Sequence, residues 1–122
     1  MADPIYPVAV QPMAISDIIV WEEGGGRYSR SVVTIESGTV VKLGNILEPS
    51  GAANTYELLD GTGEPSAIAL QDVDASGGAK DIVALTGHAV VRGNYLGYNS
   101  QTVATVNAAL ETNAQIKVRF SV

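Results

Sequence analysis

The sequence predicts an all-β fold with one short helix, in a single small domain. Three observations predict it. The chain has 122 residues, 46% of them hydrophobic, which suits one packed core. Turn signals built on Gly, Pro, Asn or Asp recur about every 8–12 residues between short β-branched runs, which is the spacing of an all-β domain. Only one stretch of the chain carries helical spacing.

The expected strands are runs rich in Val, Ile, Thr and Leu, each closed by a turn signal. They cover residues 32–35, 40–43, 46–47, 55–59, 67–70, 81–86, 88–91 and 116–120. The run Ala67 to Leu70 is wholly apolar, which predicts a strand buried on both faces. The run Ile116 to Phe120 alternates apolar and charged residues, so we expect one buried face and one charged face.

One segment, from Ser100 to Asn113, predicts a helix of about ten residues. Val103, Val106 and Leu110 follow one another at spacings of three and four. A hydroxyl side chain at the start of this segment can cap the helix, and an asparagine suits its end.

The first 30 residues differ from the rest. Three of the five prolines fall within the first twelve positions, which predicts an extended and irregular start. An apolar run ending at Trp21 then precedes Glu22-Glu23-Gly24-Gly25-Gly26, and consecutive glycines suit a hinge. We interpret residues 1–30 as an extended N-terminal arm and residues 31–122 as one β-rich domain. The side chains expected to dock on another surface are Ile15, Ile18, Ile19, Val20 and Trp21. The alternative is that this run is an ordinary first strand, with Trp21 in the core.

Charge and composition exclude several functions. The chain has 7 Lys+Arg against 13 Asp+Glu, a net charge of −6, and the cations are scattered along the sequence. This pattern disfavours nucleic acid and anionic membranes as partners, because both need clustered cations. The chain contains no cysteine, which excludes disulfides, zinc–thiolate sites and thiol nucleophiles. The N-terminus has no signal-peptide pattern, and no apolar run approaches a membrane span, so we expect a protein used without export.

The segments that resemble catalytic or metal-binding motifs are each incomplete, so we expect no catalytic residue, cofactor or metal. The stretch from Asp72 to Gly77 resembles the start of a calcium loop, but the twelfth position is Val83 where an EF-hand has a bidentate Glu. We expect a polar turn there. His88 is the only histidine, and no Gly-x-Ser-x-Gly elbow accompanies it.

Five segments follow one another in a characteristic order and spacing within roughly residues 15–120. They are 29–38, 40–47, 67–75, 84–91 and the pair 107–110 and 116–119. Their order and spacing resemble the head decoration (capsid-stabilising) proteins of tailed bacteriophages, the lambda protein D type. One departure is the link 112–115, where the family pattern leads us to expect a Gly at the helix end.

The resemblance implies a compact β domain with a bent β-ribbon, an incomplete barrel of the β-clip or β-tulip kind. It also implies a homotrimer on the local three-fold axes of the expanded icosahedral head, bound to the major capsid protein. The N-terminal arm would order on the capsid and add to a sheet of the capsid protein. The protein would then lie on the outer surface of the virion after assembly in the host cytoplasm, without catalysis or cofactor.

Two other functions stay open at this point. A small β-sandwich carbohydrate-binding or fibre module would use exposed aromatic side chains, with Trp21, Tyr56, Tyr95 and Tyr98 as candidates. A small β-barrel hydrolase would need His88 beside a carboxylate and a nucleophile in one cleft.

Overall fold

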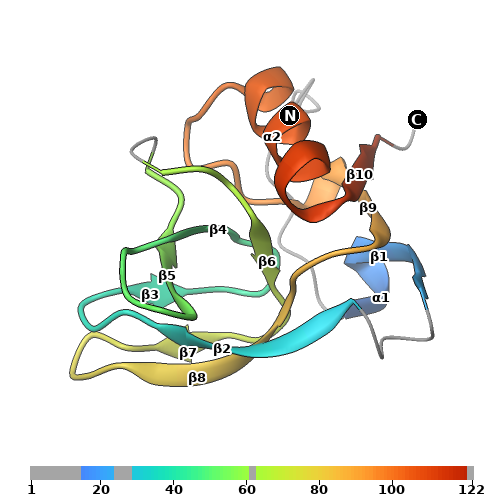
Figure 1. Cartoon of the computed structure of the whole chain (residues 1–122). Coiled ribbons are helices and arrows are strands. Elements are labelled where there is room, and N and C mark those ends of the chain that lie inside the picture. The colour runs from blue at the N-terminus through green and yellow to red at the C-terminus, as the bar shows by residue number, and fades with distance from the viewer. Residues whose placement is uncertain (1–14, 24–28, 61–62, 121–122) are drawn as a thin grey trace, which may run out of the picture.

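A computed structural model describes residues 15–23, 29–60 and 63–120 of the chain (Figure 1). The predicted irregular start (1–14) and the triple glycine (24–26) lie outside these residues. The elements in chain order are α1 (Ile15–Ile18), β1 (Ile19–Glu22), β2 (Arg30–Ile35), β3 (Val40–Val41), β4 (Ile46–Pro49), β5 (Thr55–Leu58), β6 (Ala67–Ala69), β7 (Val73–Asp74), β8 (Lys80–Leu85), β9 (Ala89–Arg92), the 3₁₀ turn η2 (Gly93–Tyr95), α2 (Val103–Ala114) and β10 (Ile116–Arg119).

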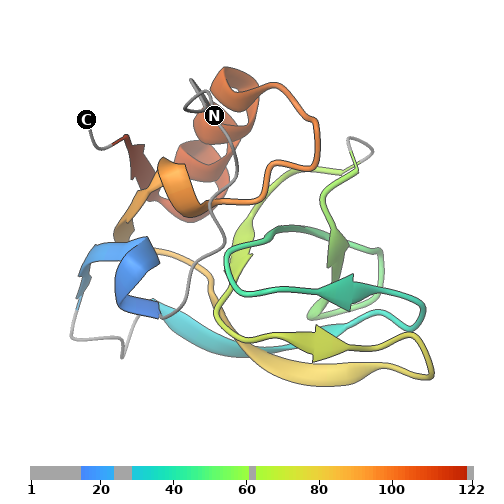
Figure 2. The ribbon, with the colours of Figure 1, turned by 180° about the vertical axis from the view of Figure 1, so that it is seen from behind.

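Five strands close into a small barrel in the order β2-β5-β4-β6-β8 (Figures 1 and 2). All neighbours in it are antiparallel except β2 and β5, which pair in parallel over a short register. A separate two-stranded ribbon, β3 and β7, lies against the barrel. The barrel is closed, whereas the family resemblance led us to expect an incomplete one.

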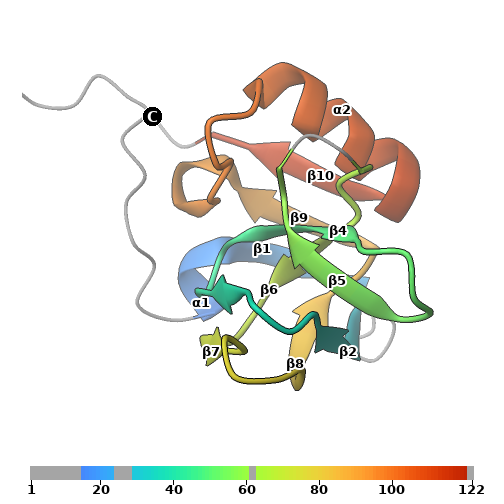
Figure 3. The ribbon, with the colours of Figure 1, turned by 90° about the vertical axis from the view of Figure 1, so that its left-hand side faces the viewer.

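The second sheet has three strands in the order β1-β9-β10. β9 pairs antiparallel with β1 and in parallel with β10. Figure 3 shows α2, β10, β9 and β1 lying one after another, with α1 beside β1. This sheet therefore contains the first and the last described strand of the chain.

Two hydrophobic clusters hold these parts together. Small side chains such as Ala67, Ala69 and Ala84 share one cluster with Val33 and Leu47, as a narrow five-stranded barrel requires. The other cluster joins the barrel to α1, α2 and the three-stranded sheet. Its members are Ile18, Ile46, Leu59, Ile68, Leu70, Leu85, Ala89, Val91, Leu96, Val106, Leu110, Ala114 and Ile116. Since β6 contributes alternate residues to both clusters, it is buried on both faces, which confirms the prediction from its apolar run.

Most of the predicted elements are confirmed, including the final alternating strand and the helix, which spans 12 residues. The helix ends on Gln115, which adopts the left-handed conformation (φ 55°, ψ 39°) that glycine usually supplies. Its N–H donates to the carbonyls of Leu110 and Glu111, so the predicted departure from the family pattern still gives a capped helix.

The apolar run before Gly24, which we interpreted as part of an extended arm, pairs within the chain, as the alternative of a first strand expected for its second part. Its first part forms the helical turn α1, and its second part is β1, which pairs with β9. This partner lies about 70 residues away in sequence, so no local pattern indicates it.

Candidate functional site

The five side chains expected to dock on another surface divide into two groups. Ile18 is fully buried (0% exposed), and Ile15 and Ile19 pack against the same core cluster. Val20 and Trp21 are 46% and 55% exposed, which excludes Trp21 from the core. The first group attaches the segment to the domain, and the second group is available to a partner.

A β-bulge explains why two successive apolar residues are exposed. The register of β1 on β9 shifts between Ile19, opposite Val91, and Trp21, opposite Val90. The extra residue is Val20, so the strict alternation of side chains is broken at this point. The exposed fractions of Val20 and Trp21 show the result: two consecutive side chains of an edge strand reach solvent.

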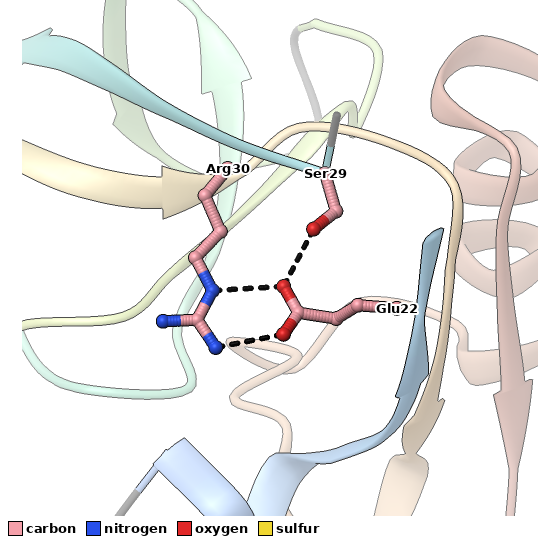
Figure 4. Close-up of polar contacts among 3 residues, drawn as sticks. All are labelled: Glu22, Ser29 and Arg30. Atoms are coloured by element: carbon pink, nitrogen blue, oxygen red, sulfur yellow. Dashed lines mark hydrogen bonds and ion pairs between the residues drawn. The ribbon is translucent and has the colours of Figure 1, made fainter. Parts of the chain in front are cut away.

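Glu22 ties the end of β1 to the start of β2 (Figure 4). Its two carboxylate oxygens accept hydrogen bonds from Arg30 Nε (2.8 Å) and Nη2 (2.7 Å). The Ser29 hydroxyl donates a third at 2.5 Å. The Glu22 side chain is only 9% exposed, so this carboxylate is mostly shielded from solvent.

Two physical effects act on this ion pair. The pKa of Glu22 is lowered mainly by the hydrogen bond from Arg30, and also by the hydrogen bond from Ser29 and by the positive charge of Arg30. Burial acts in the opposite direction and raises it. The same bond raises the pKa of Arg30. Bidentate guanidinium–carboxylate pairs are geometrically specific, so Glu22 fixes where β1 sits relative to the barrel. The pair also borders a shallow depression of about 360 Å³ that Ile15 and Ile19 complete.

A second cluster of carboxylates lies at the other end of the barrel. Glu48 of β4 is fully buried and sits directly opposite Glu57 of β5, and one ligand oxygen of each residue lies within 4.8 Å of one on Asp60. The backbone N–H of Asp60 donates to Glu48 Oε1 at 3.2 Å. The hydrogen bond to Glu48 is the main cause that raises the pKa of Glu57 to about 7, with burial second. Near neutral pH a proton therefore offsets the repulsion between the two glutamates.

The residues needed by the alternative functions do not converge. His88 lies at the end of the three-stranded sheet with φ 52°, and its Nδ1 lies 3.3 Å from Glu23. Tyr56 packs against the barrel cluster, and Tyr95 and Tyr98 pack against the other one. The Tyr98 hydroxyl donates to Asn107 at 2.6 Å, and burial raises its pKa to about 12. These tyrosines support the cores and do not form a stacking platform with Trp21.

The calcium-like stretch is a polar turn at Ser76 and Gly77, but Val73 and Asp74, which we expected in the same turn, form the short strand β7. Asp74 accepts hydrogen bonds from the backbone N–H and the hydroxyl of Ser76, and these bonds lower its pKa. Asp72 accepts the backbone N–H of Leu43 at 2.6 Å. Both aspartates thus serve the connections of the β3–β7 ribbon.

Sequence reasoning missed the two glutamate sites. Glu22 and Arg30 flank the triple glycine, and this opposite charge on either side of a loop was the available signal. Glu48 and Glu57 flank the turn at residues 50–54, so a hairpin would place them side by side. In both cases the two partners lie on either side of a short loop or turn, and we did not predict the contact across it.

Within the described part of the chain, the geometry defines a class: a small closed β-barrel beside a three-stranded sheet whose bulged edge strand exposes Val20 and Trp21. No described helix is long and apolar enough to cross a membrane. Residues 8–118 match the family model "Bacteriophage lambda head decoration protein D". A search of curated proteins found no match.

Because the match covers nearly the whole chain, the chain belongs to the lambda head decoration protein D family. The protein is accordingly a structural capsid protein of the phage virion and not an enzyme.

Proposed function

We propose that this decoration protein is a trimeric cement, bound to the major capsid protein on the local three-fold axes of the expanded head. It sits on the outer surface of the head after assembly in the host cytoplasm and stabilises the shell against internal pressure. The family match over residues 8–118 carries the proposal. A three-fold protein also matches a three-fold site, and three linked attachments raise the effective concentration of each.

The attachment is made by the N-terminal segment of residues 1–30. Two features of the described part support this. Among the described strands, β1 is at the edge of its sheet and pairs with a strand on one side only, so a capsid strand could pair with its other side. The side chains of Val20 and Trp21 are exposed on the same strand, and Trp is enriched among residues that dominate binding energy.

The buried position of Ile18 decides how the arm must be tested. Deleting residues 1–23 removes Ile18 and all of β1, so loss of binding would be confounded with loss of folding. Deleting residues 1–14 leaves every described residue in place. We expect this shorter deletion to keep the native thermal unfolding and the trimer mass, and to lose binding to expanded heads that lack decoration protein.

Co-sedimentation with such heads measures the binding, and light scattering measures the mass. Full decoration by the protein without residues 1–14 would contradict the role of that part of the arm. A monomeric mass for the full chain, both free and bound to heads, would contradict the trimer. A Trp21→Ser variant tests the part of the site that the structure describes, because an exposed side chain leaves folding intact.

A further inference from the structure

The charges of this acidic protein are distributed unevenly. The three strands β1, β9 and β10 contain three cations, Arg92, Lys117 and Arg119, and one acidic residue, Glu22. The rest of the chain holds four Lys+Arg and twelve Asp+Glu. Since Glu22 is bound to Arg30, its charge is already neutralised. The sheet is therefore cationic within a chain of net charge −6.

The register of β10 on β9 gathers these cations on one face. Lys117 lies opposite Val90, and Arg119 lies opposite Arg92. Paired residues of neighbouring strands project to the same side, and successive residues alternate. Ala89, Val91 and Ile116 are buried in the core, so the other set faces outward. Lys117 and Arg119 are accordingly exposed.

The exposed end of β1 continues this outward face. Trp21 lies opposite Val90 in the antiparallel register, and the bulge brings Val20 to solvent beside it. We call these outward-facing residues the cationic face, and its members are Val20, Trp21, Val90, Arg92, Lys117 and Arg119. Arg92 also donates to the backbone carbonyl of Asp17 at 3.1 Å. Among the described residues, neither Lys117 nor Arg119 has an ion-pair partner.

Two acidic side chains near this face contact residues that are not members of it. Glu22 points toward β2, where Arg30 and Ser29 hold it (Figure 4). Glu23 follows at the end of the sheet and contacts His88. The face thus combines an exposed Trp and two arginines, which are residue types enriched at protein–protein interfaces, with one lysine.

We propose that the cationic face docks on an acidic surface of the capsid protein, beside the place where the arm attaches. This rests on the proposed function, because it takes the capsid protein as the partner. Continuity favours the capsid over a second copy of the chain, since β1 belongs both to the sheet of this face and to the proposed arm. Charge complementarity determines the chemistry of the partner surface, because exposed cations are matched by carboxylates on the partner. Such opposite charges orient the two proteins as they meet and speed their association.

The test reverses the two exposed cations without touching the core. The K117E/R119E variant changes the net charge from −6 to −10. The matched control is K42E/K80E, which makes the same change at two exposed lysines outside this sheet. Binding of wild type, variant and control to expanded heads without decoration protein is measured by co-sedimentation at several salt concentrations. Thermal unfolding and light scattering establish that each protein is folded and of the same oligomeric mass.

We expect K117E/R119E to bind at least about tenfold more weakly, with a weaker salt dependence, and the control to stay within about twofold of wild type. Equal binding by variant and wild type, or equal loss by variant and control, overturns the proposal. Loss of oligomeric mass in the variant alone assigns the face to a second copy. A mobility shift of duplex DNA by wild type, lost in the variant, assigns it to nucleic acid. If wild type does not bind the heads at all, the proposed function itself fails.

Discussion

Replacing Ile18 by alanine measures whether residues 15–22 belong to the folded domain. Ile18 is 0% exposed and shares a cluster with Val91 and Leu96. Loss of a buried isoleucine combines the lost transfer free energy with a cavity, about 2–5 kcal/mol in total. We expect the free energy of unfolding to fall by about 3 kcal/mol, a large part of the roughly 5–15 kcal/mol of a small domain. The free energy of unfolding decreases by about 1–3 kcal/mol for each molar increase in urea, so the urea concentration at the midpoint of unfolding should fall by about 1–3 M.

The assay is urea unfolding followed by Trp21 fluorescence and circular dichroism at one fixed protein concentration, because self-association contributes to apparent stability. Val20→Ala is the matched control: the side chain is two positions along and 46% exposed, so we expect a loss of at most about 0.5 kcal/mol. Equal, small losses in both variants would refute the reasoning. Such a result would mean that residues 15–22 do not contribute to the domain core in the free protein.

Three further perturbations test other contacts. Arg30→Met should cost about 1–2 kcal/mol of stability, because it leaves the mostly buried Glu22 carboxylate without its main partner. Since the pKa of Glu22 is lowered from 4.5, the pair's contribution is present above that pH, and the difference from wild type in urea unfolding should shrink as pH falls below it. Glu57 behaves oppositely: its pKa is raised from 4.5 to about 7, so its contribution is complete below pH 4.5 and is lost as pH rises through 7. Glu57→Gln should therefore be more stable than wild type above pH 7 by on the order of 1 kcal/mol, and an unchanged pH profile of thermal unfolding would contradict the shared proton. Gly87→Ala places a Cβ 2.9 Å from a backbone carbonyl oxygen at the end of α2, so the free energy of unfolding should fall by about 1–3 kcal/mol. The control Gly77→Ala meets no atom within 4 Å and should be nearly neutral. Equal thermal unfolding of the two variants would show that α2 shifts freely.

The sequence allowed the barrel strands and the long helix to be predicted because their signals are local. Apolar or β-branched residues between turn signals mark β2, β5, β6 and β8, and the spacing of Val103, Val106 and Leu110 marks α2. The closure of the barrel could not be predicted, because it depends on a parallel contact between β2 and β5 that no turn connects. The four-residue helical turn α1 was missed for a related reason. Its isoleucines favour a strand locally, and burial of Ile18 in the tertiary core decides the outcome.

The candidate site was predicted in composition but not in arrangement. The sequence pointed to five apolar residues, and only burial separates Ile15, Ile18 and Ile19 from the exposed Val20 and Trp21. The bulge that exposes those two is set by the register on β9, which lies far along the chain. The scattered cations likewise gave no sign of a common face, because Arg92 and Arg119 lie opposite each other only through the parallel pairing of β9 with β10.

These contacts change the energetics of attachment. An arm of 30 residues that ordered only on the capsid would lose about 1–2 kcal/mol of backbone entropy for each residue fixed. Residues 15–22 are already placed by Ile18, by pairing with β9 and by the Glu22–Arg30 pair. Binding then does not have to supply about 8–16 kcal/mol for those eight residues. Preorganisation of this kind strengthens binding without any new contact. Hence a weaker Glu22–Arg30 pair should weaken capsid binding even though neither side chain needs to touch the capsid.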